Sequence, residues 1–320
     1  MIRKTIITDF VYGKAIFQLP KEIIKTLGKR IDLKNINDQK LDPDLVEIYW
    51  GTRIKNLDIK KYKNLKWIHF GSIGTDKIKY SSLKDKKIIV TNSKAINSMS
   101  VAKLIFIYLL DIEKKILKLN NFSNRDNYEK KIQNNLNLSH EKILILGYGS
   151  IAKKINILTS QLKLNIDFYS SRSSLLKKKN ILNYKQSIKK LNKYKVIINL
   201  LKYNDRNKNF MNKNFIKKLN KFVNLILVGR LETIDLKYLN NFLTKNKKSF
   251  AYMDAQSNIL NKDIFNKIKK LNNLFLTPHI GGYYNDYWTD QYELFNQNLI
   301  KYLNGKKLKN IVKIEKNNFS

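Results

Sequence analysis

A glycine-containing turn follows an apolar run near the middle of the 320-residue chain, in the segment KILILGYGSIAKKI. Gly147 permits a tight turn, and Gly149 lets a charged group approach the backbone. Ala152 stands where a third glycine is usual and keeps the following helix close to the strand. The N–H groups and the dipole at the start of that helix favour phosphate. The turn is therefore predicted to bind the pyrophosphate of a dinucleotide. Its residues are Gly147, Tyr148, Gly149, Ser150, Ile151 and Ala152.

The residues after the next apolar strand bear on which nicotinamide dinucleotide is bound. In the segment NIDFYSSRS, Ser170 and Arg172 stand where NAD-binding proteins usually have an Asp or Glu for the ribose 2′-hydroxyl. A hydroxyl and a guanidinium are instead donors suited to a 2′-phosphate. The alternative is a basic loop with no special role. Because the glycine turn precedes this segment, we expect NADP to be preferred to NAD.

Short apolar runs alternate with helical patterns on both sides of these motifs. The strand-like runs cover residues 5–10, 46–50, 65–70, 87–91, 142–146, 165–169, 196–200, 225–228, 250–253 and 274–276. Such alternation is typical of parallel β-α-β units. Helical spacing also predicts a long helix over residues 95–118 and a closing amphipathic helix over residues 286–303. The sequence thus predicts an α/β protein with two Rossmann-like domains and parallel sheets, joined by bridging helices.

The composition excludes several classes of site. The chain has no Cys, which excludes disulfides, thiolate nucleophiles and Cys-ligated metals, and we expect no metal site. The opening MIRKTIITDF lacks the apolar length of a signal peptide, and no apolar run approaches a membrane span, so we expect a soluble, cytoplasmic protein with no membrane contact. The formal net charge of +38 suits a polyanionic partner. The basic residues are nevertheless spread along the whole chain, which favours a compositional bias and argues against nucleic acid.

Further motifs, taken in their order and spacing, resemble the D-isomer-specific 2-hydroxyacid dehydrogenases over nearly the whole chain. FGSIGTDKI at residues 70–78 is similar to the family's substrate loop, and VTN at 90–92 precedes a segment similar to its bridging helix. LVGRLETIDLKYL at 227–239 resembles the family's arginine strand, and LTPHIGG at 276–282 resembles its histidine motif. The segment NLIKYLNGKKLKNIV resembles its closing helix and tail.

This resemblance implies a hydride transfer between a nicotinamide cofactor and C2 of a small 2-keto or 2-hydroxy acid. Arg230 would hold the substrate carboxylate and carbonyl, because a guanidinium matches a planar pair of acceptors. His279 would donate the proton as the carbonyl becomes an alcohol. Backbone N–H groups around Ile73 and Gly74 would bind the other side of the carboxylate.

The resemblance also implies the domain organisation and further cofactor contacts. Val228 and Asp254 would contact the cofactor, with Asp254 near the nicotinamide amide. Residues 96–285 would form the nucleotide-binding domain, inserted into a substrate-binding, catalytic domain made of residues 1–95 and 286–320. Two copies of the chain are expected to form a homodimer through the nucleotide-binding domain.

One departure from the family pattern concerns the proton donor. The family's Glu that hydrogen-bonds the catalytic His would fall near Ile259, and no Glu occurs between Glu232 and Glu293. Asn258, one residue away, could orient the ring of His279 without a charge, so it joins the candidate catalytic residues. Loss of the carboxylate predicts a lowered pKa for His279 and puts efficient turnover in doubt.

Two alternatives to an active enzyme stay open. A dehydrogenase-like protein that binds nucleotide but has impaired catalysis would explain the missing Glu. A basic nucleic-acid-binding or scaffold protein would explain the charge. No helix-turn-helix, zinc or aromatic-basic motif supports the second alternative.

Overall fold

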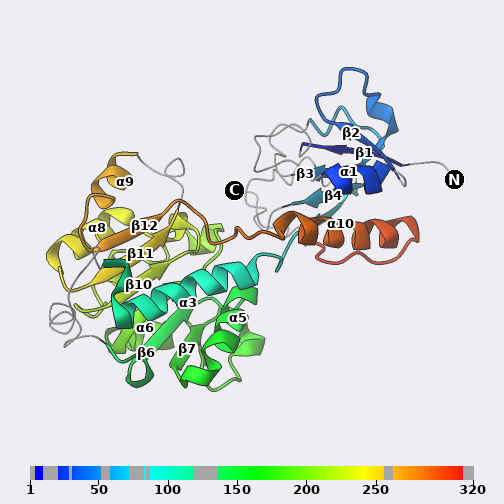
Figure 1. Cartoon of the computed structure of the whole chain (residues 1–320). Coiled ribbons are helices and arrows are strands. Elements are labelled where there is room, and N and C mark those ends of the chain that lie inside the picture. Colours follow the sequence, from blue (N-terminus) through cyan, green and yellow to red (C-terminus); the bar gives the residue numbers. More distant parts are fainter. Residues whose placement is uncertain are drawn as a thin grey trace. The chain divides into compact units, whose positions relative to one another are not determined.

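The computed structural model describes residues 4–9, 21–28, 31–51, 58–71, 83, 87–118, 136–255 and 262–312 (Figure 1). The chain divides into two compact units. Unit 1 contains Met1–Ile96 and Tyr284–Ser320, and unit 2 contains Asn97–Tyr283. The predicted boundaries of 95/96 and 285/286 lie one and two residues from these. Each unit is built around a parallel sheet, so the predicted α/β class with two parallel sheets is confirmed.

Unit 1 holds a five-stranded parallel sheet in the order β2-β1-β3-β4-β5. Its strands are β1 (Lys4–Thr8), β2 (Ile31–Asn35), β3 (Val46–Gly51), β4 (Trp67–Phe70) and β5 (Ile89–Asn92), and its helices are α1 (Lys21–Gly28) and α10 (Tyr287–Leu303). The apolar side of α10 packs on the sheet through aromatic rings. Phe295 stacks on Trp50 with ring centroids 4.0 Å apart and on Trp67 at 5.3 Å. The predicted closing helix is therefore fixed to the ends of β3 and the start of β4.

Unit 2 holds a seven-stranded parallel sheet in the order β12-β11-β10-β9-β6-β7-β8. Its strands are β6 (Lys142–Leu146), β7 (Asn165–Tyr169), β8 (Ile181–Leu182), β9 (Tyr194–Asn199), β10 (Asn224–Leu227), β11 (Phe250–Asp254) and β12 (Leu274–Thr277). Its helices are α3 (Ser98–Lys114), α5 (Ser150–Thr159), α6 (Tyr184–Lys189), α7 (Lys213–Ile216), α8 (Leu236–Lys245) and α9 (Lys262–Ile268). The order reverses between β6 and β9, as in doubly wound nucleotide-binding folds.

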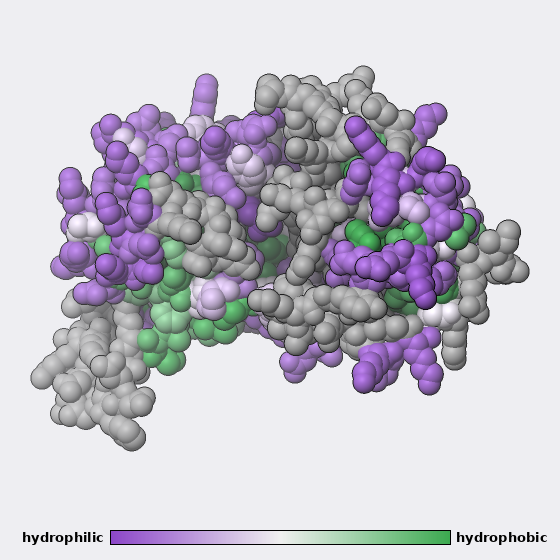
Figure 2. Space-filling model, turned by 90° about the horizontal axis from the view of Figure 1, so that it is seen from above, coloured by the Kyte–Doolittle hydropathy of each residue, from purple (hydrophilic) through white to green (hydrophobic). Residues whose placement is uncertain are grey.

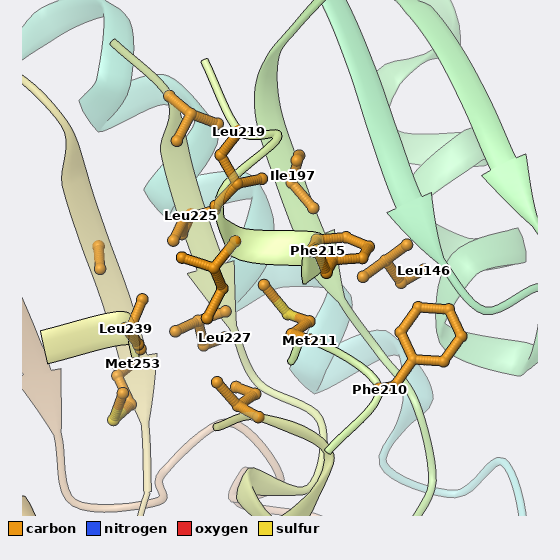
Figure 3. Packing of buried hydrophobic residues seen from close by; sticks show 14 of the residues in the cluster. Leu146, Ile197, Phe210, Met211, Phe215, Leu219, Leu225, Leu227, Leu239 and Met253 are labelled. Atoms are coloured by element: carbon orange, nitrogen blue, oxygen red, sulfur yellow. The ribbon is translucent and has the colours of Figure 1, made fainter. Parts of the chain in front are cut away.

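The strands of unit 2 are apolar on both faces because helices cover both faces. Ile198 of β9 points into a cluster with α3 and α5, and its neighbour Ile197 points into the cluster on the opposite face. Figure 3 shows this second cluster, in which Phe215 and Leu239 pack against the strands. Burial on both sides explains the continuous apolar runs in the sequence. Among the described residues no helix is long and apolar enough to cross a membrane, and no three acidic or histidine side chains gather as metal ligands.

The helix predicted over residues 95–118 is shorter in the structure. Helix α3 ends at Lys114, and Lys115 adopts a left-handed conformation with φ of 57°. Asp111 causes this ending, because its carboxylate accepts the N–H of Leu117 at 2.7 Å and the hydroxyl of Tyr252 at 2.7 Å. A side-chain acceptor thus replaces the next helical turn.

Candidate functional site

The glycine turn lies at the carboxyl end of β6, where the strand order reverses. Open α/β sheets bind ligands at this point, because the loops after the two strands diverge. Gly147 has a φ of +110°, which side chains rarely allow, and donates its N–H to the Tyr169 carbonyl at 3.1 Å. A Cβ at Gly147 would lie 3.4 Å from the Leu200 carbonyl after β9. The positive φ, more than the space toward Leu200, therefore favours glycine at this position.

The start of α5 is open to a ligand. Gly149 is the N-cap residue of α5, and no side chain caps the helix. A Cβ at Gly149 would meet no atom of the described residues within 4 Å, so no neighbouring segment of the described chain crowds the backbone at this point. The Ser98 hydroxyl donates to the Ser150 hydroxyl at 2.8 Å, which ties the first turn of α5 to α3. Ala152 is fully buried, as close helix-to-strand packing requires. This arrangement fits a pyrophosphate.

Cations surround Tyr148 in the middle of the turn. The Arg172 guanidinium donates to the Tyr148 carbonyl, and the Arg172 N–H donates to the buried Ser170 hydroxyl at 3.2 Å. Lys153 and Lys178 place their ammonium groups 6.0 and 5.8 Å from the centre of the Tyr148 ring. The chain has no acidic residue from 168 to 204. The two lysines were not anticipated, because they lie apart in sequence and meet only around Tyr148.

Arg230 follows β10 at the same edge of the sheet. Its N–H donates to the Leu201 carbonyl at 3.1 Å, and the N–H of Gly229 donates to the Asn199 carbonyl at 2.8 Å. A Cβ at Gly229 would lie 2.9 Å from the Leu201 carbonyl oxygen, so only glycine allows this approach. The Thr233 hydroxyl donates to the Arg230 carbonyl at 2.5 Å. The backbone of Arg230 is thus held against the loop that follows β9.

Asp254 braces the turn that carries His279. One oxygen of the buried Asp254 carboxylate accepts from the Thr277 hydroxyl at 2.6 Å and from the N–H of Ile280 at 2.8 Å. The other oxygen accepts from the N–H of Gly281 at 2.9 Å. His279, between these donors, has a φ of 60°, a left-handed conformation that costs free energy outside glycine. The three bonds to Asp254 hold the turn in this conformation.

The pKa of His279 is lowered from its ordinary value of 6.5. Burial is the largest cause, and the like charge of Arg230 lowers the pKa further, while the negative charge of Asp254 raises it. The predicted direction is therefore correct. Burial is a cause that the sequence did not suggest, and Asp254 places a negative charge near the ring. The effect of the missing Glu near Ile259, a position outside the described residues, stays a prediction. Arg230 and Asp254 thus both lie close enough to His279 to influence its charge, and all three belong to unit 2.

A hydroxyl from α3 continues this network. The Tyr108 hydroxyl lies 2.8 Å from the Thr277 hydroxyl, which donates to Asp254. Burial, with the nearby charge of Asp254, raises the pKa of Tyr108 to about 12. Tyr108 therefore stays neutral at working pH and can donate its proton to Thr277. The support of the His279 turn thus extends from β11 and β12 to α3.

A family comparison agrees with this geometry. Residues 106–281, more than half of the chain, match the profile described as "D-isomer specific 2-hydroxyacid dehydrogenase, NAD binding domain". The chain belongs to the D-isomer specific 2-hydroxyacid dehydrogenase family. The resemblance read from the sequence is confirmed, and the matched stretch places the family's NAD-binding domain in unit 2.

Two curated relatives are similar to part of this family member. A D-3-phosphoglycerate dehydrogenase of Methanocaldococcus jannaschii is 26% identical over 156 residues, which are 48% of this chain and 29% of the relative. A D-3-phosphoglycerate dehydrogenase of Haemophilus influenzae is 26% identical over 216 residues, 66% of this chain and 52% of the relative. The similar stretch therefore spans about half or less of these relatives.

Solved structures of 2-hydroxyacid dehydrogenases share the fold. The enzyme from Ketogulonicigenium vulgare aligns with a TM-score of 0.77 at 16% identity, over 98% of this chain and 100% of that one. D-lactate dehydrogenase from Aquifex aeolicus, complexed with NAD and lactic acid, gives 0.71 at 21% identity, over 94% and 96%. An NADPH-dependent glyoxylate/hydroxypyruvate reductase from Sinorhizobium meliloti, complexed with NADP and malonate, gives 0.75 at 15% identity, over 97% of both chains.

The remaining predicted site residues of this dehydrogenase family member divide into two groups. Val228 is half-buried and directly follows β10, on the same edge of the sheet as the glycine turn. Ile73, Gly74 and Asn258 lie outside the described residues, as does Ile259. Their roles stay predictions.

Proposed function

We propose that this protein is an NADPH-dependent reductase of small 2-keto acids, which oxidises the corresponding D-2-hydroxy acids in the reverse direction. The observation that carries this proposal is the grouping of Arg230, His279 and Asp254 in the unit that also holds the open glycine turn. A guanidinium and an acid are the two groups that carbonyl reduction requires from the protein. Membership of the dehydrogenase family supports the same reaction.

The residues of the chain perform binding, orientation and proton transfer in this proposal. Arg230 binds the substrate carboxylate and polarises the C2 carbonyl, because two of its N–H groups match a planar pair of acceptors. His279 in its cationic form donates a proton to the carbonyl oxygen. NADPH, when bound, supplies the hydride that adds to C2. In the oxidation direction neutral His279 accepts the hydroxyl proton, and its lowered pKa makes that form abundant at neutral pH.

The preference for NADPH rests on the cations around the glycine turn. Arg172, Lys153 and Lys178 gather around Tyr148, and the Ser170 hydroxyl lies beside them at the end of β7. Asp167, the nearest acid in sequence, sits inside β7 and accepts from the Tyr194 hydroxyl at 2.7 Å. It is therefore engaged within the fold. A 2′-phosphate would gain charge-assisted bonds here, whereas the segment after β7 offers no carboxylate to a free ribose diol, since residues 168–204 contain no acid.

The proposed reaction is tested by following nicotinamide absorbance with glyoxylate, pyruvate and hydroxypyruvate, each with NADPH and with NADH. We expect oxidation of NADPH that depends on the keto acid, at mildly acidic pH. The variant Arg172→Ala should weaken NADPH binding by roughly 1.5–3 kcal/mol, because it removes a charge-assisted contact. Binding of NADH should change little.

The control is Lys142→Ala, which removes a positive charge at the opposite, amino-terminal end of β6. It should leave the affinities for both cofactors unchanged. NADH binding as tight as NADPH binding in the wild type would contradict the cofactor preference. NADPH binding without turnover of any keto acid at any pH would instead support a nucleotide-binding protein that has lost catalysis.

We also propose that the protein forms a homodimer through unit 2. On the outer side of α3 and just after it, Ile107, Leu110, Ile116 and Leu117 are between 38% and 60% exposed. Figure 2 shows a mostly hydrophilic surface with an area where hydrophobic side chains gather. Exposed apolar groups of this kind favour burial against a partner.

The variant Ile107→Asp should convert the dimer into a monomer in sedimentation experiments, because it places a charge in the proposed contact. The control Leu45→Asp changes an exposed apolar residue of unit 1, which is 63% exposed, and should leave the dimer intact. A wild-type protein that sediments as a monomer would refute the proposal.

A further inference from the structure

Buried polar side chains form a connected network where β4 and β5 end in unit 1. The Trp67 indole N–H donates to the Thr91 hydroxyl at 2.8 Å, and that hydroxyl lies 2.7 Å from Nδ1 of His69. The Ser93 hydroxyl lies 3.4 Å from Nε2 of His69 and donates to Oε1 of Gln291 at 2.5 Å. All five side chains are at most 1% exposed. Burying polar groups costs free energy unless they are paired, so a buried network of five polar side chains suggests a role beyond packing.

The network ends on the carbonyl oxygen of Gly71. Nε2 of Gln291 donates to this oxygen at 2.9 Å, and the hydroxyl of Tyr287 donates to it at 3.0 Å. The N–H of Gly71 donates to the carbonyl of Gly51 at 3.0 Å. Three hydrogen bonds therefore fix the peptide groups on either side of Gly71. Two of them come from α10, which lies more than 200 positions further along the chain.

The donors and acceptors follow one direction through the network. The carbonyl oxygen of Gly71 can only accept a hydrogen bond. Gln291 must therefore direct its amide N–H₂ group to this oxygen and its amide oxygen to Ser93. The single proton of the Ser93 hydroxyl faces two acceptors, Oε1 of Gln291 at 2.5 Å and the Phe70 carbonyl at 2.8 Å, so Ser93 can only accept from His69. Burial lowers the pKa of His69 to about 3, so the ring is neutral, with its proton on Nε2. Thr91 accepts from Trp67 and then donates to Nδ1 of His69, so each hydrogen bond in the network has one donor and one acceptor.

The network is not needed to attach α10 to the sheet. Helix α10 is already attached to the sheet by apolar stacking of Phe295 on Trp50 and Trp67. Tyr287 and Gln291 lie in the first turns of α10, and both donate to the carbonyl of Gly71, the residue that follows β4. Gly71 stands two positions before Ile73, the first predicted donor to the substrate carboxylate. Hydrogen bonds fix direction as well as position, which apolar contacts do not.

We propose that Tyr287 and Gln291 are positioning residues, which orient the peptide of Gly71 and so set the start of the loop that binds the substrate carboxylate. This inference rests on the proposed function and on the carboxylate-binding role that the family resemblance implies for Ile73 and Gly74. Neither side chain needs to touch substrate. Both act through the backbone of Gly71.

The test is the variant Tyr287→Phe, which removes one donor to Gly71 and leaves the buried network of Gln291 in place. Hydrogen exchange followed by mass spectrometry should show faster deuterium uptake in the peptide covering residues 70–78. The KM for the keto acid should rise about threefold to tenfold, as expected for one lost hydrogen bond. The KM for NADPH should stay unchanged.

The matched control is Tyr302→Phe, the same chemical change further along α10. The Tyr302 hydroxyl donates to Glu47 at 2.8 Å, within the same unit and away from Gly71. It should lower the stability of unit 1 about as much as Tyr287→Phe does, with no change in uptake at 70–78 or in either KM. The stronger variant Gln291→Met removes the second donor and should enlarge both effects.

The outcomes separate the two proposals. Equal uptake at residues 70–78 in wild type and Tyr287→Phe overturns the positioning role, whether or not the enzyme reduces keto acids. Equal effects of Tyr287→Phe and Tyr302→Phe on the KM for the keto acid overturn it as well. Faster uptake in Tyr287→Phe, together with no keto acid reduction by the wild type, supports the positioning of the loop and counts against the proposed function.

Discussion

The variant His279→Ala is expected to reduce 2-keto acids roughly 10²–10⁴-fold more slowly than the wild type, the usual effect of removing a general acid. The reason is chemical, because the carbonyl oxygen then gains its proton only from water. NADPH should bind with nearly unchanged affinity, because the proposed phosphate contacts come from the glycine turn and the cations beside it and not from His279. Steady-state rates and NADPH fluorescence titration measure the two quantities.

Two further variants separate lost chemistry from a lost turn. His279 has a φ of 60°, which alanine tolerates poorly and asparagine tolerates well. The variant His279→Asn should therefore keep the turn and still lose the activity. His140→Ala removes an exposed histidine of the same unit and should change neither rate nor binding. An active His279→Asn enzyme would show that another group donates the proton.

The glycine turn was predictable because its chemistry is local. A buried strand, Gly147, Gly149 and a helix start follow one another directly, and the structure shows the required φ at Gly147 and the open space at Gly149. The same holds for the central strands, whose apolar runs stand out. The edge strands β2 and β8 were missed, because IDLKN carries charges and β8 has only two residues. Edge strands are covered less fully and give weaker patterns.

The support of the catalytic residues was not predictable, because it depends on contacts across the sheet. Asp254 and Thr277 are register partners on β11 and β12, and this pairing is set by the sheet. The sequence suggested only that Asp254 lies near the nicotinamide amide. In the structure both its oxygens accept bonds from the His279 turn. Gly229 was likewise unremarkable in the sequence, since the carbonyl it must accommodate belongs to Leu201.

Reduction by the wild type is expected to be fastest at mildly acidic pH and to fade above neutrality. The acid in the reaction is cationic His279, and its pKa lies below 6.5 because of burial and Arg230. As pH rises through this pKa, the cationic form is lost and the rate of reduction falls with it. Oxidation of the hydroxy acid needs neutral His279 and should persist at neutral pH. Full reductase activity at pH 9 would contradict this expectation.

The variant Asp254→Asn should move the pH limit of reduction still lower and slow the reaction at least roughly tenfold at neutral pH. Removing the negative charge of Asp254 removes the one influence that raises the pKa of His279 among those named above. The carboxylate of Asp254 accepts three hydrogen bonds, whereas the amide of Asn has an N–H₂ group in place of one oxygen. At least one of the three donors is then left unpaired, which should lower the unfolding free energy by about 1–3 kcal/mol.

The control for Asp254→Asn is Asp235→Asn, the same change at the N-cap of α8, where Asp and Asn are equivalent and the carboxylate accepts the N–H of Tyr238. It should change neither the pH profile nor the stability. Thr277→Val removes one bond to Asp254 but keeps the charge, so it should lower stability without moving the pH limit. If Asp254→Asn and Thr277→Val give the same pH profile, Asp254 only supports the turn. If the profile moves in Asp254→Asn alone, its charge also sustains the acid form of His279, the part that the family's usual Glu plays.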